Sequence, residues 1–325
     1  MQARCSVGGP AGRSQVYWRQ CILASMASVK SGSTSEVAEK ESIALGVMRS
    51  TLRCLSVLEL LAMPPFEYGL TQTAQVLGLA KGTARRFLAT LEAAGYVERD
   101  PVHRVYRLAS KSLIVGTAYL RRSPFYRAAY LHMQELARKA EVMVHLSIKD
   151  GDTVLFLSTV GQPGTVYLYA DIGERRPIHA TAMGKLLLAL GPDSEVKRIL
   201  AKPLQRYTAR TIVDPAAMQA ELALIRKKGY SVMYREIYEQ LGAVAAPIHD
   251  SSGKVVAAIC ADVNADTLTP ESELRYAKIL LETALRISVQ LGYRPANPDM
   301  AIMTSLGQPF LGAASGTKRE VPSAR

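Results

Sequence analysis

Three breaker sites between residues 52 and 108 constrain most strongly what this chain can fold into. Pro64-Pro65 cannot continue a helix, and Gly78 and Gly95 supply the tight turns at which helices end. Between these breakers, apolar residues recur at the three- and four-residue spacing of one helix face. The spacing predicts helices over residues 52–62, 71–77 and 81–94.

Two strand-like runs follow, at residues 96–99 and 104–108, with Asp100-Pro101 as the turn between them. Helix, helix, tight turn, helix and hairpin is an order typical of a winged helix-turn-helix. We therefore expect a DNA-binding domain over residues 45–110 and a linker helix over residues 111–123.

Positive charge is concentrated in this part of the chain. Residues 42–122 carry a net charge of +6, half of the total of +12. In the third helix a guanidinium of Arg85 or Arg86 matches the O6/N7 acceptor pair of guanine. Taken alone, the basic helix face is more typical of an ordinary solvated surface than of a DNA contact, but its combination with the two preceding helices, the glycine turn and the basic hairpin favours DNA. The other expected DNA contacts are Thr71 (also the expected N-cap of the second helix), Lys81 and Thr83, with His103 and Arg104 at the wing tip.

From residue 124 onward the pattern changes to strands alternating with helices. One hairpin pairs residues 142–148 with 153–160, and another pairs residues 242–249 with 254–263. Adjacent hairpins with helices outside them predict an antiparallel sheet covered by helices, and therefore an α+β chain. The helices are expected at residues 126–141, 182–190, 194–200, 215–228 and 270–291.

The chain of 325 residues is long enough for two domains, each with its own hydrophobic core. The second domain is expected over residues 124–294. Residues 1–44 and 295–325 are rich in small and polar residues without a sustained period, so we expect both to be disordered tails. Met1 and Met26 are both candidate translation starts.

Several classes of protein do not fit. No apolar run approaches the roughly 20 residues that span a bilayer, so no membrane partner is expected. Four widely spaced cysteines indicate neither a disulfide framework nor a zinc site, which fits a reducing cytoplasm. The five histidines are scattered, and no nucleophile motif, phosphate-binding loop or dinucleotide fingerprint is present. We expect no enzyme activity, no metal and no cofactor.

Residues 71–97 (TQTAQVLGLAKGTARRFLATLEAAGYV) resemble the winged helix-turn-helix of IclR-type transcriptional regulators. Residues 176–189 (RPIHATAMGKLLLA) are similar to the signature of that family's effector domain, as are residues 245–248 (AAPI) followed by 255–259 (VVAAI). The resemblance covers about residues 46–293. Residues 207–212 also look compatible with the subgroup that controls aromatic-acid breakdown.

The resemblance implies a homodimer or tetramer that binds double-stranded operator DNA, and a GAF-like C-terminal domain that binds a small-molecule effector, often a carboxylate. A two-fold dimer requires a roughly palindromic operator. The resemblance points to an effector site at the helix start Ala182, Met183 and Gly184 and at strand positions Ala243, Cys260 and Asp262, with His179, Met233 and Arg235 as neighbours. Free backbone N–H groups before Gly184 would suit an anion.

Each of these effector residues also has a purely structural interpretation. Cys260 and Met183 fit a packed core, His179 fits a hydrogen bond to a loop carbonyl, and Asp262 fits a strand position that faces water. A carboxylate at position 262 also repels an acid ligand unless Arg235, His179 or a ligand hydroxyl compensates.

The sequence thus favours a DNA-binding regulator whose operator binding is modulated by a metabolite, an organic or aromatic acid. In the alternative, the C-terminal domain serves only protein association. The signature at residues 182–184 disfavours this alternative, because it favours a ligand cavity. We expect the effector to change the spacing of two recognition helices through the linker helix.

Overall fold

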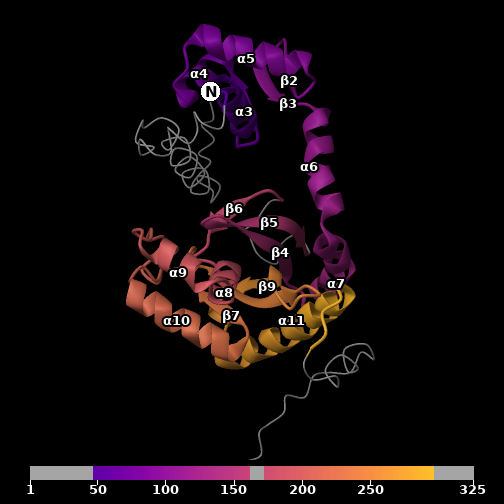
Figure 1. Cartoon of the computed structure of the whole chain (residues 1–325), viewed down its shortest axis with the longest axis vertical. Helices are drawn as coiled ribbons and strands as arrows, with labels where there is room; N and C mark the ends of the chain where they lie inside the picture. Colours follow the sequence, from indigo (N-terminus) through magenta and orange to yellow (C-terminus); the bar gives the residue numbers. More distant parts are fainter. Residues whose placement is uncertain (1–46, 162–171, 296–325) are drawn as a thin grey trace, which may run out of the picture. The chain divides into compact units, whose positions relative to one another are not determined.

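The computed structural model describes residues 47–161 and 172–295, which form two compact units that divide between Tyr119 and Leu120 (Figure 1). The two predicted tails lie outside the described residues, apart from Pro295. No described helix is long and apolar enough to cross a bilayer.

The first unit is a helix-turn-helix with a small three-stranded antiparallel sheet of order β1-β3-β2. The helices and hairpin expected here are present; the sequence pattern misses β1, because three residues are too few to show a period. Its elements are α3 (Arg49–Leu61), β1 (Glu67–Gly69), α4 (Leu70–Leu77), α5 (Lys81–Ala93), β2 (Val97–Asp100) and β3 (Val105–Leu108), followed by α6 (Ser110–Arg122).

A small apolar core fixes α3, α4 and α5 against one another, with Val57, Leu77 and Leu88 at its centre. Gly78 ends α4 in the left-handed conformation, at φ 60°, which glycine adopts without steric cost. The expected N-cap role of Thr71 is wrong. Gly69 occupies that position, and its N–H donates to the Gln72 side chain at 2.9 Å.

The second unit is built on one six-stranded antiparallel sheet of order β6-β5-β4-β9-β8-β7. Both expected hairpins form its centre, and β6 and β7 are short strands at its two edges. The elements are α7 (Pro124–Ala140), β4 (Met143–Asp150), β5 (Thr153–Val160), β6 (Arg175–Pro177), α8 (Ala182–Ala189), α9 (Asp193–Leu200), α10 (Pro215–Lys228), β7 (Ser231–Tyr234), β8 (Leu241–His249), β9 (Val255–Asn264), a 3-10 turn (Ala265–Thr267) and α11 (Pro270–Gln290).

Helices cover both faces of this sheet, and therefore β8 and β9 are buried along almost their whole length. On one face α7 and α11 pack on Val144, Leu146 and Ile259. On the other face, termed here the α8 face, α8 packs on the sheet, and α9 and α10 pack against α8 and complete a cluster that includes Phe156 and Ala258. Since side chains alternate along a strand, every second residue of the central strands points to the α8 face.

Candidate functional site

Helix α5 presents a basic surface over its first half. Ala84, Leu88 and Leu91 are buried and fix which side of the helix faces inward. Arg85 and Arg86 are exposed, and no acidic residue lies in the first turn. The N-cap residue makes no side-chain hydrogen bond to the N–H groups at this helix end. The positive end of the helix dipole and these cations together suit a phosphate backbone.

The other expected DNA contacts are spread over α4, α5 and the hairpin. Thr71, Lys81, His103 and Arg104 are exposed, and Thr83 is half-buried. The four exposed residues are therefore accessible to DNA within the first unit, and Thr83 is partly accessible.

The hairpin tip is organised by Asp100. Its Oδ1 accepts the N–H groups of Val102 and His103 at 2.8 and 3.0 Å, and its Oδ2 lies 2.8 Å from His103 Nδ1. The hydrogen bonds from His103 lower the pKa of Asp100 to about 2, and the same side-chain contact raises the pKa of His103. The imidazole at the wing tip is thus biased toward its cationic form.

In the second unit, five of the expected effector residues share one buried apolar cluster on the α8 face. A hydroxyl–sulfur contact of 3.0 Å from Ser147 to the Met183 sulfur joins strand β4 to the start of α8 across this cluster. Met183 and Cys260 are both buried in this cluster, and both also border the polar groups described below. The five are Ala182, Met183, Met233, Ala243 and Cys260.

The start of α8 differs from the expected open anion cradle. Thr181 is its N-cap, and the Thr181 hydroxyl accepts the Gly184 N–H at 3.1 Å, so this N–H is not free for a ligand. Gly184 is required by packing: a Cβ there would lie 2.1 Å from the carbonyl oxygen of Ile178. The glycine lets the helix start approach the preceding loop closely.

Asp262 lies on the α8 face and is 4% exposed, so it does not face water. Burial alone would raise its pKa, but nearby His145 and Arg176 outweigh this and hold the pKa below its ordinary value. Arg235 and His179 were the groups expected to compensate Asp262, but His145 and Arg176 lie near it instead. The Arg235 guanidinium binds the Glu239 carbonyl at 2.8 Å and the Asp266 carboxylate.

His179 follows its structural interpretation. Its Nε2 lies 2.9 Å from the carbonyl oxygen of Gln205, and its ring packs at 5.9 Å from that of Tyr207. Burial lowers the pKa of His179, which favours the neutral imidazole.

Arg176 is a buried cation that sequence reasoning did not single out. Its Nε lies 2.8 Å from Glu174 Oε1, and its guanidinium lies over the rings of Phe156 and Tyr238 at 5.1 and 5.6 Å. Only its position within the signature of residues 176–189 marks it in the sequence.

Lys185 is a second buried cation, with 1% of its side chain exposed. Its Nζ lies 2.6 Å from Glu236 Oε1 and 2.8 Å from Glu221 Oε1. Burial raises the pKa of Glu236, although Lys185 acts in the opposite direction. A lysine inside a helix that is otherwise apolar was the available signal for this pair.

Residues 205–211 connect the loop before α8 to the loop after β7 through hydrogen bonds. The Thr211 hydroxyl accepts the N–H groups of Tyr207 and Thr208 and donates to the Glu236 carbonyl at 2.6 Å. The Thr208 hydroxyl donates to the Arg235 carbonyl at 2.5 Å. Together with Lys185, these contacts fix the loop that carries Tyr238 beside Arg176.

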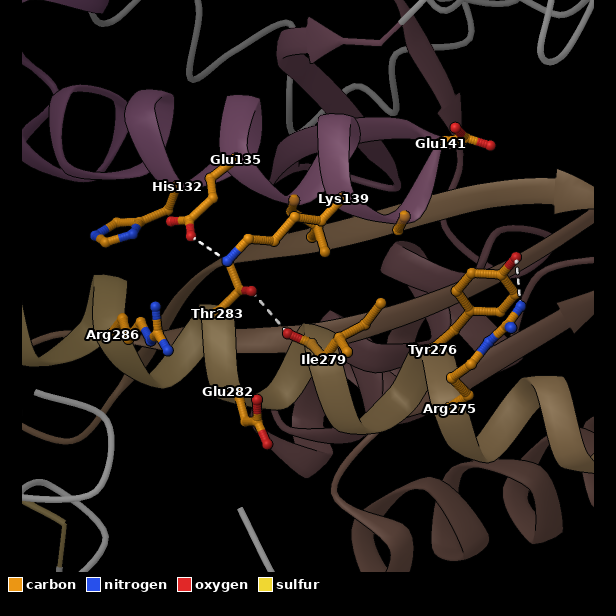
Figure 2. Close-up of a pocket in the computed structure, with 12 residues that line it drawn as sticks. His132, Glu135, Lys139, Glu141, Arg275, Tyr276, Ile279, Glu282, Thr283 and Arg286 are labelled. Carbon is orange, nitrogen blue, oxygen red and sulfur yellow. Dashed lines mark hydrogen bonds and ion pairs between the residues drawn. The ribbon is translucent and has the colours of Figure 1, made fainter. Parts of the chain in front are cut away.

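A groove of about 640 Å³ lies between α7 and α11, on the sheet face opposite the α8 face (Figure 2). Lys139 bridges to Glu135 at 2.5 Å within it, and the Arg275 guanidinium contacts the Tyr276 hydroxyl at 3.3 Å (Figure 2). None of the expected effector residues lines it. Within the described ranges, no group of His, Cys, Asp and Glu side chains is arranged to hold a metal ion.

Comparison with known proteins covers both units. The bacterial transcriptional regulator IclR C-terminal domain matches residues 117–289, and the IclR helix-turn-helix domain matches residues 50–101. The HTH-type transcriptional regulator KdgR of Escherichia coli is 31% identical over 245 residues, which are 75% of this chain and 93% of KdgR.

Two further relatives extend this match. The glycerol operon regulatory protein of Streptomyces coelicolor is 34% identical over 228 residues, which are 70% of this chain and 89% of that protein. The crystal structure of an IclR homologue from Microbacterium hydrocarbonoxydans, complexed with 4-hydroxybenzoate, matches with a TM-score of 0.67 and 26% identity over 74% of this chain and 98% of that one. These relatives are regulators, not enzymes. The chain belongs to the IclR family of transcriptional regulators, with an N-terminal helix-turn-helix that binds DNA and a C-terminal effector-binding domain.

Proposed function

We propose that this regulator binds a roughly palindromic operator as a homodimer or tetramer, and that an organic or aromatic acid bound on the α8 face modulates this binding. The observation that carries the DNA part is the exposed basic first half of α5, held by a buried inner face. Arg85 or Arg86 reads a guanine edge, and the remaining cations contact phosphates. Action on operator DNA accords with the cytoplasmic location expected from the sequence.

The effector part is supported by the concentration of buried polar groups on the α8 face. His145, Arg176 and Asp262 lie there among apolar side chains, which is the composition of a small-molecule site. A relative complexed with 4-hydroxybenzoate supports an aromatic acid. A relative that regulates a glycerol operon supports the broader class of small oxygenated metabolites.

Coupling between the two sites requires that the effector bind one arrangement of the protein better than another. We propose that α6 carries this difference to the spacing of paired recognition helices. Equal effector affinity of the free and the operator-bound protein would contradict this route.

The test measures binding of the purified chain to DNA from upstream of its own gene and its neighbours, at several salt concentrations. Arg85→Ala and Arg86→Ala are compared with Lys278→Ala, which removes an exposed cation of α11. Loss of about 1–3 kcal/mol at one site, with little change on unrelated DNA, identifies a base-reading arginine. A uniform loss identifies a phosphate contact, and no loss for either arginine contradicts the proposed role of α5.

A further inference from the structure

His145 and Asp262 lie together on the α8 face at the centre of the sheet. They stand on neighbouring strands, β4 and β9, where Met143 is paired with Asp262 and His145 with Cys260. His145 is 0% exposed and Asp262 is 4% exposed. Both polar groups are therefore removed from bulk water, and each needs a partner within the domain.

The partners present do not satisfy this pair. The Cys260 thiol, a weak donor, contacts Asp262 Oδ1 at 3.5 Å. His145 Nε2 lies 3.2 Å from Asp262 Oδ2, but outside hydrogen-bond geometry, so Nε2 makes no hydrogen bond among the described residues. The other ring nitrogen, Nδ1, lies 3.1 Å from the Thr159 hydroxyl. A buried carboxylate has about four acceptor sites, and among the described residues only the Cys260 thiol donates to Asp262 with hydrogen-bond geometry.

A hydroxyl group meets both needs at once, because it donates one hydrogen bond and accepts others. A second carboxylate could accept from His145 Nε2, but it cannot donate to Asp262 when ionised, and it would repel Asp262. We propose that His145 and Asp262 form a subsite for a hydroxyl of the effector, whose O–H donates to Asp262 and whose oxygen accepts from His145 Nε2. The effector is then a hydroxylated acid, with the hydroxyl and not the acid group facing Asp262.

This inference rests on the proposed function and narrows its effector class. The site lies beside Met183 and Cys260, so the hydroxyl would enter the same buried cluster that holds the expected effector residues. Arg176 lies near enough to influence the charge on Asp262, and it keeps this face from being uniformly anionic.

The test uses the full chain and matched pairs of ligands that differ by one hydroxyl: 4-hydroxybenzoate with benzoate, 3-hydroxybutyrate with butyrate, and glycolate with acetate. Isothermal titration calorimetry and thermal shift measure each affinity. Where a pair binds, we expect the hydroxylated member to bind about ten- to a hundred-fold more tightly, because a hydrogen bond to a buried charge is formed only by that member. Asp262→Asn, which removes the charge at constant shape, is expected to reduce this ratio to about three-fold or less.

Asp193→Asn, the same change at an exposed aspartate of α9, is the control and should leave the ratio unchanged. Equal affinities within the pairs would overturn the proposal and indicate that water satisfies Asp262. An Asp262→Asn variant that kept the wild-type affinity ratio between the hydroxylated and the unhydroxylated ligand would overturn it as well. If none of the hydroxylated ligands binds while operator binding is intact, the hydroxy-acid class is overturned but the DNA-binding function is not. If the Asp262→Asn variant does not fold, the affinity ratios of the wild type still test the hydroxyl subsite.

Discussion

Lys185 Nζ lies 2.6 Å from Glu236 Oε1 although the lysine side chain is only 1% exposed. This ion pair joins α8 to the loop after β7. The backbone carbonyls of this loop also accept hydrogen bonds from the hydroxyls of Thr208 and Thr211. Two carboxylates and one ammonium group are thus held in a region where an unpaired charge is costly.

Lys185→Met is therefore expected to lower the free energy of unfolding by about 3–5 kcal/mol, since it leaves buried Glu236 without its cation. Urea denaturation followed by circular dichroism measures this change. Lys202→Met is the control, because Lys202 is 57% exposed and pairs with Asp152 at the surface, where loss of a pair costs about 1 kcal/mol or less. A double variant, Lys185→Met with Glu236→Met, should recover part of the loss. Equal effects of the two single lysine variants would contradict the importance of the buried pair.

Gly184→Ala is expected to destabilise the second unit by about 1–3 kcal/mol or more, because the new Cβ would overlap the Ile178 carbonyl oxygen. Gly116→Ala is the matched control. Gly116 lies in α6, where an added Cβ would meet nothing outside its own helix within 4 Å, so alanine should be neutral or stabilising by up to about 1 kcal/mol. Thermal unfolding of both variants gives the comparison. Similar melting temperatures for the two variants would show that the loop before α8 shifts to accommodate the added Cβ at little cost in stability.

The contact between His103 and Asp100 predicts a pH dependence of DNA binding. The folded-state pKa of His103 is raised, so the contribution of this pair to stability is full below the unfolded value of about 6.5 and is lost as pH rises through the folded value. The Asp100 contribution is present above its unfolded pKa and is lost as pH falls toward about 2. As pH rises above about 6.5, DNA affinity should therefore fall more steeply for the wild type than for His103→Gln. Fluorescence anisotropy at constant ionic strength measures both profiles, and parallel curves would contradict a role for His103 at the DNA.

Exposed apolar side chains on α6 predict self-association through this helix. Leu113 and Ile114 are each 67% exposed, and no residue of α6 is buried. Ile114→Glu is expected to weaken the proposed homodimer at least about ten-fold, since a charge would be desolvated at the contact. Sedimentation velocity over a concentration series measures this, with Leu131→Glu as the control, because Leu131 of α7 is similarly exposed, at 72%. An unchanged association state of Ile114→Glu would exclude α6 from the contact.

Local sequence patterns predicted most of the helices and strands. Breakers such as Pro64-Pro65 and Gly78 act within one turn, and the three- and four-residue spacing of apolar side chains is set by the helix itself. The edge strands β6 and β7 were missed, because three or four residues show no clear alternation and their pairing depends on neighbours far along the chain. The N-cap of α4 was displaced from Thr71 to Gly69 because strand β1 ends directly before the helix.

The sequence by itself determined the order of elements, the basic face of α5 and the family, and it pointed to the region around Met183 and Cys260 where the effector site is proposed. Only the tertiary structure decided which polar groups meet there. The register of β4 against β9 brings His145 beside Asp262, and the packing of α8 brings Lys185 to Glu236, 51 positions further on. Such pairings are set by strand register and helix packing between distant segments, and neither leaves a local period in the sequence.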